Sequence, residues 1–203
     1  MNVKMKTALL AVCALGMGIT KNAAAFEPGD FLVRVGASYV VPRSDNHPVV
    51  DVESAASASI NFTYMMTDIW AIEVLAAYPF KHDIELLDGT KVGSTKHLPP
   101  TVNLQYHFNP NEKFQPYVGF GVNYTSFFSE STTGPLTGTD LSLGDSWGLG
   151  GQVGFDVMLS DSMFLNFDVR YIKIETKAKL DGLSIGTVEI NPWVFGTHLG
   201  FRF

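Results

Sequence analysis

The stretch that decides the fold is INPWVFGTHLGFRF, residues 190–203. From Trp193 onward, large apolar side chains recur at every second position except Thr197, and small or polar residues lie between them. A period of two indicates a β-strand with one apolar and one mixed face. In a soluble sandwich the apolar face would pack on a core, whereas in an outer-membrane barrel it would face lipid. An aromatic end at Phe203 with no polar tail favours the barrel.

The same alternation recurs along the chain and predicts eight strands, at residues 30–42, 58–66, 70–78, 101–108, 114–128, 146–159, 163–174 and 186–203. The connections alternate between long and short, and the long ones are expected to be loops at residues 42–57, 79–99, 129–145 and 175–185. An even number of strands, short periplasmic turns and long outer loops are typical of outer-membrane barrels. We therefore predict an all-β fold, an eight-stranded antiparallel transmembrane β-barrel with short periplasmic turns and long extracellular loops. A secreted sandwich or a soluble lipocalin-like barrel is the alternative.

Aromatic side chains fall at both ends of these strands, as in the girdles of membrane barrels. The lower rim is expected to hold Phe31, Trp70, Phe108, Phe114 and Phe203, and the upper rim Tyr39, Tyr78, Tyr124, Trp147, Tyr171 and Trp193.

The first 25 residues are typical of a cleaved signal peptide. Lys4 and Lys6 precede an apolar run at residues 7–19, and three alanines at 23–25 offer a cleavage site. Removing 25 of the 203 residues leaves 178, expected to form the barrel at residues 26–203. Cys13 is the single cysteine and would leave with the signal, so we expect no disulfide and no thiol chemistry.

The charge balance argues against nucleic acid as a partner. The formal net charge is −6, and it becomes −9 without Lys4, Lys6 and Lys21. An acidic chain with no basic run lacks the surface that phosphate binding needs.

Three stretches carry a resemblance to a known family: KHLPPTVNLQYHF at residues 96–108, QPYVGFGVNYT at 115–125 and NPWVFGTHLGFRF at 191–203. The chain resembles the outer membrane protein W (OmpW) family of small Gram-negative barrels. The resemblance implies an eight-stranded barrel whose narrow, largely apolar interior passes small hydrophobic molecules, with lateral release into the membrane. Thr197 and His198 depart from the mostly small or apolar residues that the resemblance implies at these positions, and of the two His198 is on the inward face.

Charged residues also fall at positions expected to face the lumen: Arg34, Glu73, Asp156, Asp168, Arg170 and Arg202. They could form a polar pathway or gate. They could equally be paired charges that fill a packed core, because an eight-stranded barrel is just wide enough to be filled by side chains.

Apolar residues at inward positions are Leu32, Val40, Met65, Leu75 and Val194, which could line a hydrophobic conduit or simply fill volume. The long loops hold further apolar residues that could shape a mouth: Leu86, Leu87, Val92, Leu98, Leu136, Leu141 and Leu143.

An enzyme is a further alternative, because Ser, His and Asp side chains in the outer loops could form a catalytic triad. The candidates are His47, His82, His97, Ser44, Ser54, Asp45 and Asp83. No Gly-x-Ser-x-Gly elbow accompanies them, and the histidines lack the close spacing of a metal site. We expect no enzymatic activity, no cofactor and no metal.

The sequence thus predicts a channel of the cell outer membrane for passive passage of small hydrophobic molecules. The alternative is a sealed structural barrel whose loops bind a phage, a bacteriocin or a host surface. We expect a monomer in contact with lipid and lipopolysaccharide. Phe203, Phe201 and Leu199 are expected to act as a C-terminal insertion signal for the barrel-assembly machinery.

Overall fold

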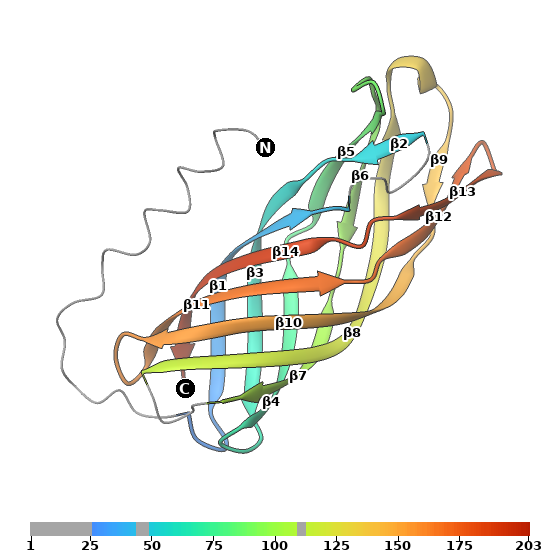
Figure 1. Cartoon of the computed structure of the whole chain (residues 1–203). Helices are drawn as coiled ribbons and strands as arrows, with labels where there is room; N and C mark the ends of the chain where they lie inside the picture. Colours follow the sequence, from blue (N-terminus) through green and yellow to red (C-terminus); the bar gives the residue numbers. More distant parts are fainter. Residues whose placement is uncertain (1–25, 44–48, 109–112) are drawn as a thin grey trace.

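The computed structural model describes residues 26–43, 49–108 and 113–203; the expected signal segment, residues 1–25, lies outside them. Eight antiparallel strands form a closed barrel, namely β1 (Phe31–Val41), β3 (Ala55–Met65), β4 (Trp70–Ala77), β7 (Thr101–His107), β8 (Phe114–Thr132), β10 (Ser146–Met158), β11 (Met163–Ile172) and β14 (Trp193–Arg202). The last strand pairs with the first, and β8 pairs with β10, so the ring has no free edge (Figure 1). The predicted eight-stranded antiparallel barrel is confirmed.

Within the described residues, no helix has the length and apolar content needed to cross a membrane.

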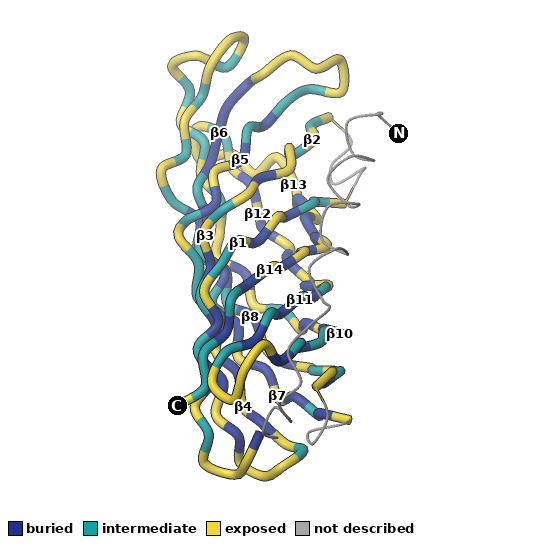
Figure 2. Tube along the Cα trace, turned by 90° about the vertical axis from the view of Figure 1, so that its left-hand side faces the viewer, coloured by how far each residue is buried: buried dark blue, intermediate teal, exposed yellow. Residues whose placement is uncertain are grey.

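Burial alternates along the barrel strands, as Figure 2 shows. On β1, Arg34 is completely buried while the next residue, Val35, is 49% exposed. The outward positions carry large apolar side chains over the whole circumference, including Val74, Val102 and Phe195. Of the aromatic residues expected at the two rims, all but Tyr124 are exposed. This outer surface is apolar where a soluble protein would be polar, which is the pattern of a wall in contact with lipid.

The long connections contain strands that the sequence did not predict. Strands β2 (Val50–Val52), β5 (Phe80–Leu86) and β6 (Lys91–Leu98) continue the sheet beside the upper part of β8. Strands β9 (Leu141–Leu143), β12 (Glu175–Leu180) and β13 (Leu183–Glu189) form a separate three-stranded sheet, and a short 3₁₀ helix, η2 (Gly134–Leu136), lies between β8 and β9. We call these elements, with the end of β8 from residue 126, the extracellular extension. The prediction of plain loops is therefore wrong for residues 79–99 and 175–185, and the loops expected at residues 42–57 and 129–145 also contain short strands, β2 and β9.

Tight turns explain how these segments form hairpins. Gly89 between β5 and β6 has a φ of 83°, and Gly182 between β12 and β13 has a φ of 77°. Glycine adopts such angles without a steric penalty, so the chain can reverse its direction within a few residues at each of these two turns.

The start of the last strand also differs from the prediction. Residues 186–189 belong to β13, and β14 begins only at Trp193. Asn191 between them has a φ of 34°, and its Oδ1 accepts a hydrogen bond from the Ile174 backbone N–H at 2.9 Å. The apolar alternation runs through this break, so the pattern joined two strands that the backbone separates.

Candidate functional site

The middle of the barrel interior is crossed by a layer of buried charged side chains. Arg34 on β1 donates through Nε and Nη2 to the two carboxylate oxygens of Asp156, at 3.2 and 2.7 Å. Its Nη1 donates to Thr63 Oγ1 at 2.6 Å and lies 3.4 Å from Glu73 Oε2. The guanidinium is thus shared between two carboxylates, one of which it holds in the strong bidentate geometry.

Glu73 on β4 accepts hydrogen bonds from three other side chains. Arg170 Nη1 donates to its Oε1 at 2.8 Å, Asn103 Nδ2 to the same oxygen at 3.2 Å, and Gln105 Nε2 to Oε2 at 2.8 Å. Arg170 also donates through Nε to Asp168 Oδ1 at 2.6 Å. The two arginines therefore connect all three carboxylates into one network.

His198 extends this network toward β3. Its Nδ1 lies 3.0 Å from Asn166 Oδ1 and 3.5 Å from Asp168 Oδ2, and its Nε2 lies 2.8 Å from Ser59 Oγ. Asn166 Nδ2 donates in turn to Asp156 Oδ1 at 2.9 Å. His198, the inward-facing one of the two residues that depart from the family pattern, is therefore part of the network. Asn166 is not among the site residues predicted from the sequence. Its position two residues before Asp168, on the same inward face of the strand, could have indicated it.

We call this network the polar layer. Every strand of the barrel contributes to it, and its members are Arg34, Ser59, Thr63, Glu73, Asn103, Gln105, Tyr117, Asp156, Asn166, Asp168, Arg170 and His198. Buried charges are tolerated when they are paired and hydrogen-bonded, and here they fill the cross-section of a narrow barrel.

Arg202 does not belong to the polar layer, unlike the other five charged residues expected in the lumen. Its Nε donates to Asp30 Oδ2 at 2.7 Å, and Glu27 lies 3.8 Å away. The last residues of β14 lie at the periplasmic rim, where an inward position is beside the N-terminal segment and not in the middle of the lumen.

The five apolar residues expected to line the lumen are all buried but do not form one continuous track. Leu32 and Met65 pack with Phe26 in a cluster on the periplasmic side of the polar layer. Val40 and Val194 belong to a larger cluster on the extracellular side. Leu75 is buried and belongs to neither cluster. The polar layer separates the two groups, because Arg34 lies between Leu32 and Val40 on the same strand.

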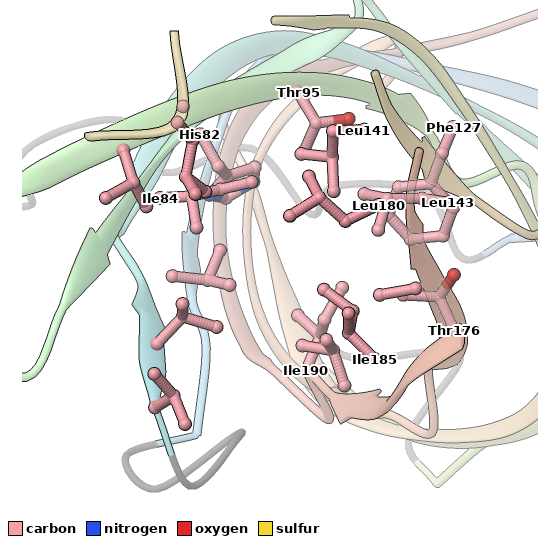
Figure 3. A pocket seen from close by; sticks show the side chains of 18 of the residues that line it. His82, Ile84, Thr95, Phe127, Leu141, Leu143, Thr176, Leu180, Ile185 and Ile190 are labelled. Carbon is pink, nitrogen blue, oxygen red and sulfur yellow. The ribbon is translucent and has the colours of Figure 1, made fainter. Parts of the chain in front are cut away.

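An apolar cavity of about 310 Å³ lies in the extracellular extension, above the larger cluster (Figure 3). Among the loop residues expected to shape a mouth, Leu86, Val92, Leu136, Leu141 and Leu143 line it. Leu87 is instead exposed, and Leu98 is not in the lining. Residues from β2, β5, β6, β8, β9, β12 and β13 meet around this space, which we call the extracellular cavity.

Two histidines are part of the cavity wall. The rings of His82 and His97 are stacked with centroids 4.9 Å apart and an interplanar angle of 17°. Phe80 stacks on His97 with ring centroids 5.4 Å apart and lies 6.4 Å from His82, and Phe127 packs against His97 at 5.8 Å. Burial lowers the pKa of His97 to about 3, with His82 as a further cause, and burial also lowers the pKa of His82. Both imidazoles are therefore neutral at pH 7 and act as part of an aromatic wall.

Acidification from pH 6.5 to pH 4 is expected to destabilise the extracellular extension. The pKa of His97 falls from 6.5 to about 3 on folding, so between these values the unfolded segment binds a proton that the folded one does not. The free energy of unfolding of the extension therefore has its full value above pH 6.5. It decreases as the pH falls, by about 3 kcal/mol at pH 4. Hydrogen-exchange protection of the β5 and β6 amides would measure it. His97→Phe should remove most of this pH dependence, and an unchanged dependence in that variant would contradict the assignment.

The catalytic alternative gains no geometric support. Ser44, Asp45 and His47 lie outside the described residues. Asp83 forms an ion pair with Lys91 at 2.5 Å. Over residues 26–43, 49–108 and 113–203, no serine hydroxyl bonds to His82 or His97, and no group of three or more His, Cys, Asp or Glu side chains could hold a metal ion.

The closed barrel, its apolar outer wall and its paired interior charges define a class of protein. They are the features of an outer-membrane β-barrel, in which every backbone group is satisfied within the ring and only apolar side chains meet lipid.

Comparison with known proteins places the chain within that class. The OmpW family model matches residues 27–203. Outer membrane protein W of Vibrio cholerae is 44% identical over 98% of this chain and 100% of its own length. The crystal structure of OprG from Pseudomonas aeruginosa superimposes with a TM-score of 0.79 at 35% identity, over 88% of this chain and 98% of that one. The solution structure of the Escherichia coli outer membrane protein W is similar with a TM-score of 0.60 at 36% identity, over 87% and 99% of the two chains.

The chain belongs to the OmpW family. It is an integral protein of the outer membrane, in contact with lipid, and its relatives are outer-membrane barrels.

Proposed function

We propose that the protein takes up small hydrophobic molecules from outside the cell and releases them sideways into the outer membrane. The observation that carries this proposal is the extracellular cavity, whose lining is almost entirely apolar and whose volume is about 310 Å³. Ligand pockets are commonly apolar spaces of roughly 300–1,000 Å³ with a few polar groups, so this cavity is at the lower end of that range. It suits a small apolar solute.

Straight passage down the lumen is disfavoured by the polar layer. A solute moving along the axis would have to separate Arg34 from Asp156 and Arg170 from Glu73, all of which are buried. Leaving a buried charge without its partner costs about 3–5 kcal/mol in proteins, and an apolar solute offers no replacement hydrogen bonds. A route that ends above the polar layer avoids this cost.

A sideways exit is supported by a break in the barrel wall between β4 and β7. Their pairing ends at Leu75 and Thr101, although β4 continues to Ala77. Pro99 and Pro100 precede Thr101, and proline has no N–H to continue the ladder. We call this unpaired stretch the seam. It follows directly on β6, whose His97 is in the wall of the extracellular cavity.

Closing the seam is expected to slow release. In Pro99→Val, Pro100→Val the backbone regains two N–H donors, so β7 can extend along Ala76 and Ala77 and seal the wall. Transfer of an apolar fluorescent dye into vesicles with a lipopolysaccharide outer leaflet would be compared for this double variant and for the wild type. Pro135→Val, in the short helix η2 away from the seam, is the control and should match the wild type.

Two outcomes would count against the proposal. Dye transfer by the wild type no faster than in protein-free vesicles would remove the transport function and leave the sealed, loop-binding barrel as the explanation. Unchanged transfer in the double variant would exclude the seam as the exit.

A further inference from the structure

Two ring nitrogens in the wall of the extracellular cavity have no hydrogen-bond partner among the described residues. They are Nε2 of His82 and Nδ1 of His97, on side chains that are only 1% and 2% exposed. Figure 3 shows His82 beside the open space of the cavity. Buried polar atoms without a partner are uncommon and carry a free-energy cost, so each needs an explanation. An ordered water molecule is a poor explanation here, because it needs two to four polar partners and the lining of this cavity is almost entirely apolar.

The tautomer of His82 fixes what this nitrogen can do. Its Nδ1 lies 2.5 Å from the backbone oxygen of Glu53, and a carbonyl oxygen only accepts, so Nδ1 carries the proton. The ring is neutral at pH 7 because burial lowers its pKa. Nε2 therefore holds a lone pair and is a hydrogen-bond acceptor, not a donor.

The position of this acceptor is held by its neighbours. The His82 ring is fixed at Nδ1 by Glu53 and on one face by His97, which in turn stacks on Phe80. A fixed acceptor needs little reorganisation when a ligand arrives.

We propose that the extracellular cavity selects small apolar molecules that carry one hydrogen-bond donor, an alcohol or a phenol, with His82 Nε2 accepting the donor. This deepens the proposed function and rests on it. The apolar lining holds the carbon skeleton, and the hydroxyl donates to His82 Nε2, an acceptor in this wall that has no partner among the described residues. A molecule of the same shape without the donor keeps the apolar contacts but leaves Nε2 unpaired, so it binds more weakly.

The test compares two fluorescent probes, 2-naphthol and 2-methoxynaphthalene, bound to the full-length protein in lipid nanodiscs. The second probe carries a methyl group on the oxygen and therefore has no donor, and His82→Phe shows how much of any preference comes from that methyl group. Wild type is expected to bind 2-naphthol about tenfold more tightly. His82→Phe keeps a flat ring but removes the acceptor, so it should bind the two probes equally while its affinity for 2-methoxynaphthalene stays unchanged. Thr95→Val is the control, because it removes another polar group from the same wall, and it should keep the wild-type preference.

A second measurement does not depend on any variant. The ¹⁵N resonance of His82 Nε2 in the wild type should move upfield when 2-naphthol is added and stay in place with 2-methoxynaphthalene. Equal affinities of the wild type for both probes, or a preference that survives in His82→Phe, would overturn the donor selectivity and leave the proposed function standing. Failure of both probes to bind the wild type would overturn the two together.

Discussion

Replacing Arg34 with methionine is expected to lower the free energy of unfolding by about 3–5 kcal/mol. Methionine fills much of the same space but leaves Asp156 without its bidentate partner and Glu73 with one guanidinium in place of two. Both carboxylates are completely buried, so water cannot replace the lost bonds. Urea unfolding of the protein in lipid vesicles, followed by tryptophan fluorescence, would measure the change.

The matched control is Arg43→Met, which removes an ion pair with Glu189 in which both side chains are about half exposed. Exposed pairs contribute about 0–1 kcal/mol, so this variant should be close to the wild type. Changing both partners of the buried pair, as in Arg34→Met, Asp156→Leu, should recover part of the loss because no carboxylate at residue 156 is left unpaired. Equal effects of the two single variants would contradict the structural role of the polar layer.

Filling the extracellular cavity is expected to have the largest effect on uptake. Leu143 on β9 lines the extracellular cavity, so Leu143→Trp places an indole in this apolar space and a solute must compete with it for room. We expect the rate of dye transfer into lipopolysaccharide vesicles to fall about tenfold, which corresponds to about 1.4 kcal/mol. Initial rates at equal amounts of folded protein would measure the effect.

Leu183→Trp is the control for this substitution. Leu183 begins β13 in the same extension, but it is 74% exposed and does not line the cavity. Its variant should transfer dye at the wild-type rate. A similar loss in both variants would mean that the tryptophan disturbs the extension as a whole, and no loss in either would mean that solutes bypass the cavity.

The barrel could be predicted from sequence because its signal is local. A period of two appears within each strand, and the alternation of short and long connections requires no knowledge of distant contacts. The strands of the extension escaped prediction for a physical reason. β5 and β6 contain several lysine and acidic residues. Their stability comes from the pairing of β6 with β8, the pairing of β5 with β6 and stacked rings such as His82 on His97.

In the candidate site, too, local features could be predicted from the sequence and contacts between distant residues could not. The alternation identified the inward charges, but not which of them meet, because pairs such as Arg34 and Asp156 are 122 residues apart in the chain. Arg202 shows the limit of the rule, since an inward position at the end of a strand faces the rim and not the lumen. The extracellular cavity is assembled from all four long connections, and no single stretch of sequence describes it.

Under the proposed function, the length of β8 sets where an encounter with a solute would take place. Its 19 residues extend about 60 Å, or about 45 Å along the membrane normal at the usual tilt, whereas the hydrocarbon core is about 30 Å thick. The upper end of this strand therefore projects roughly 15 Å into the hydrated sugars that cover a Gram-negative cell. Hydrophobic molecules dissolve poorly in that layer of sugars. The layer is therefore the main obstacle between these molecules and the bilayer. A cavity at this height would give apolar molecules a binding site within the layer of sugars. They would then travel the remaining distance to the hydrocarbon core inside the wall of the protein.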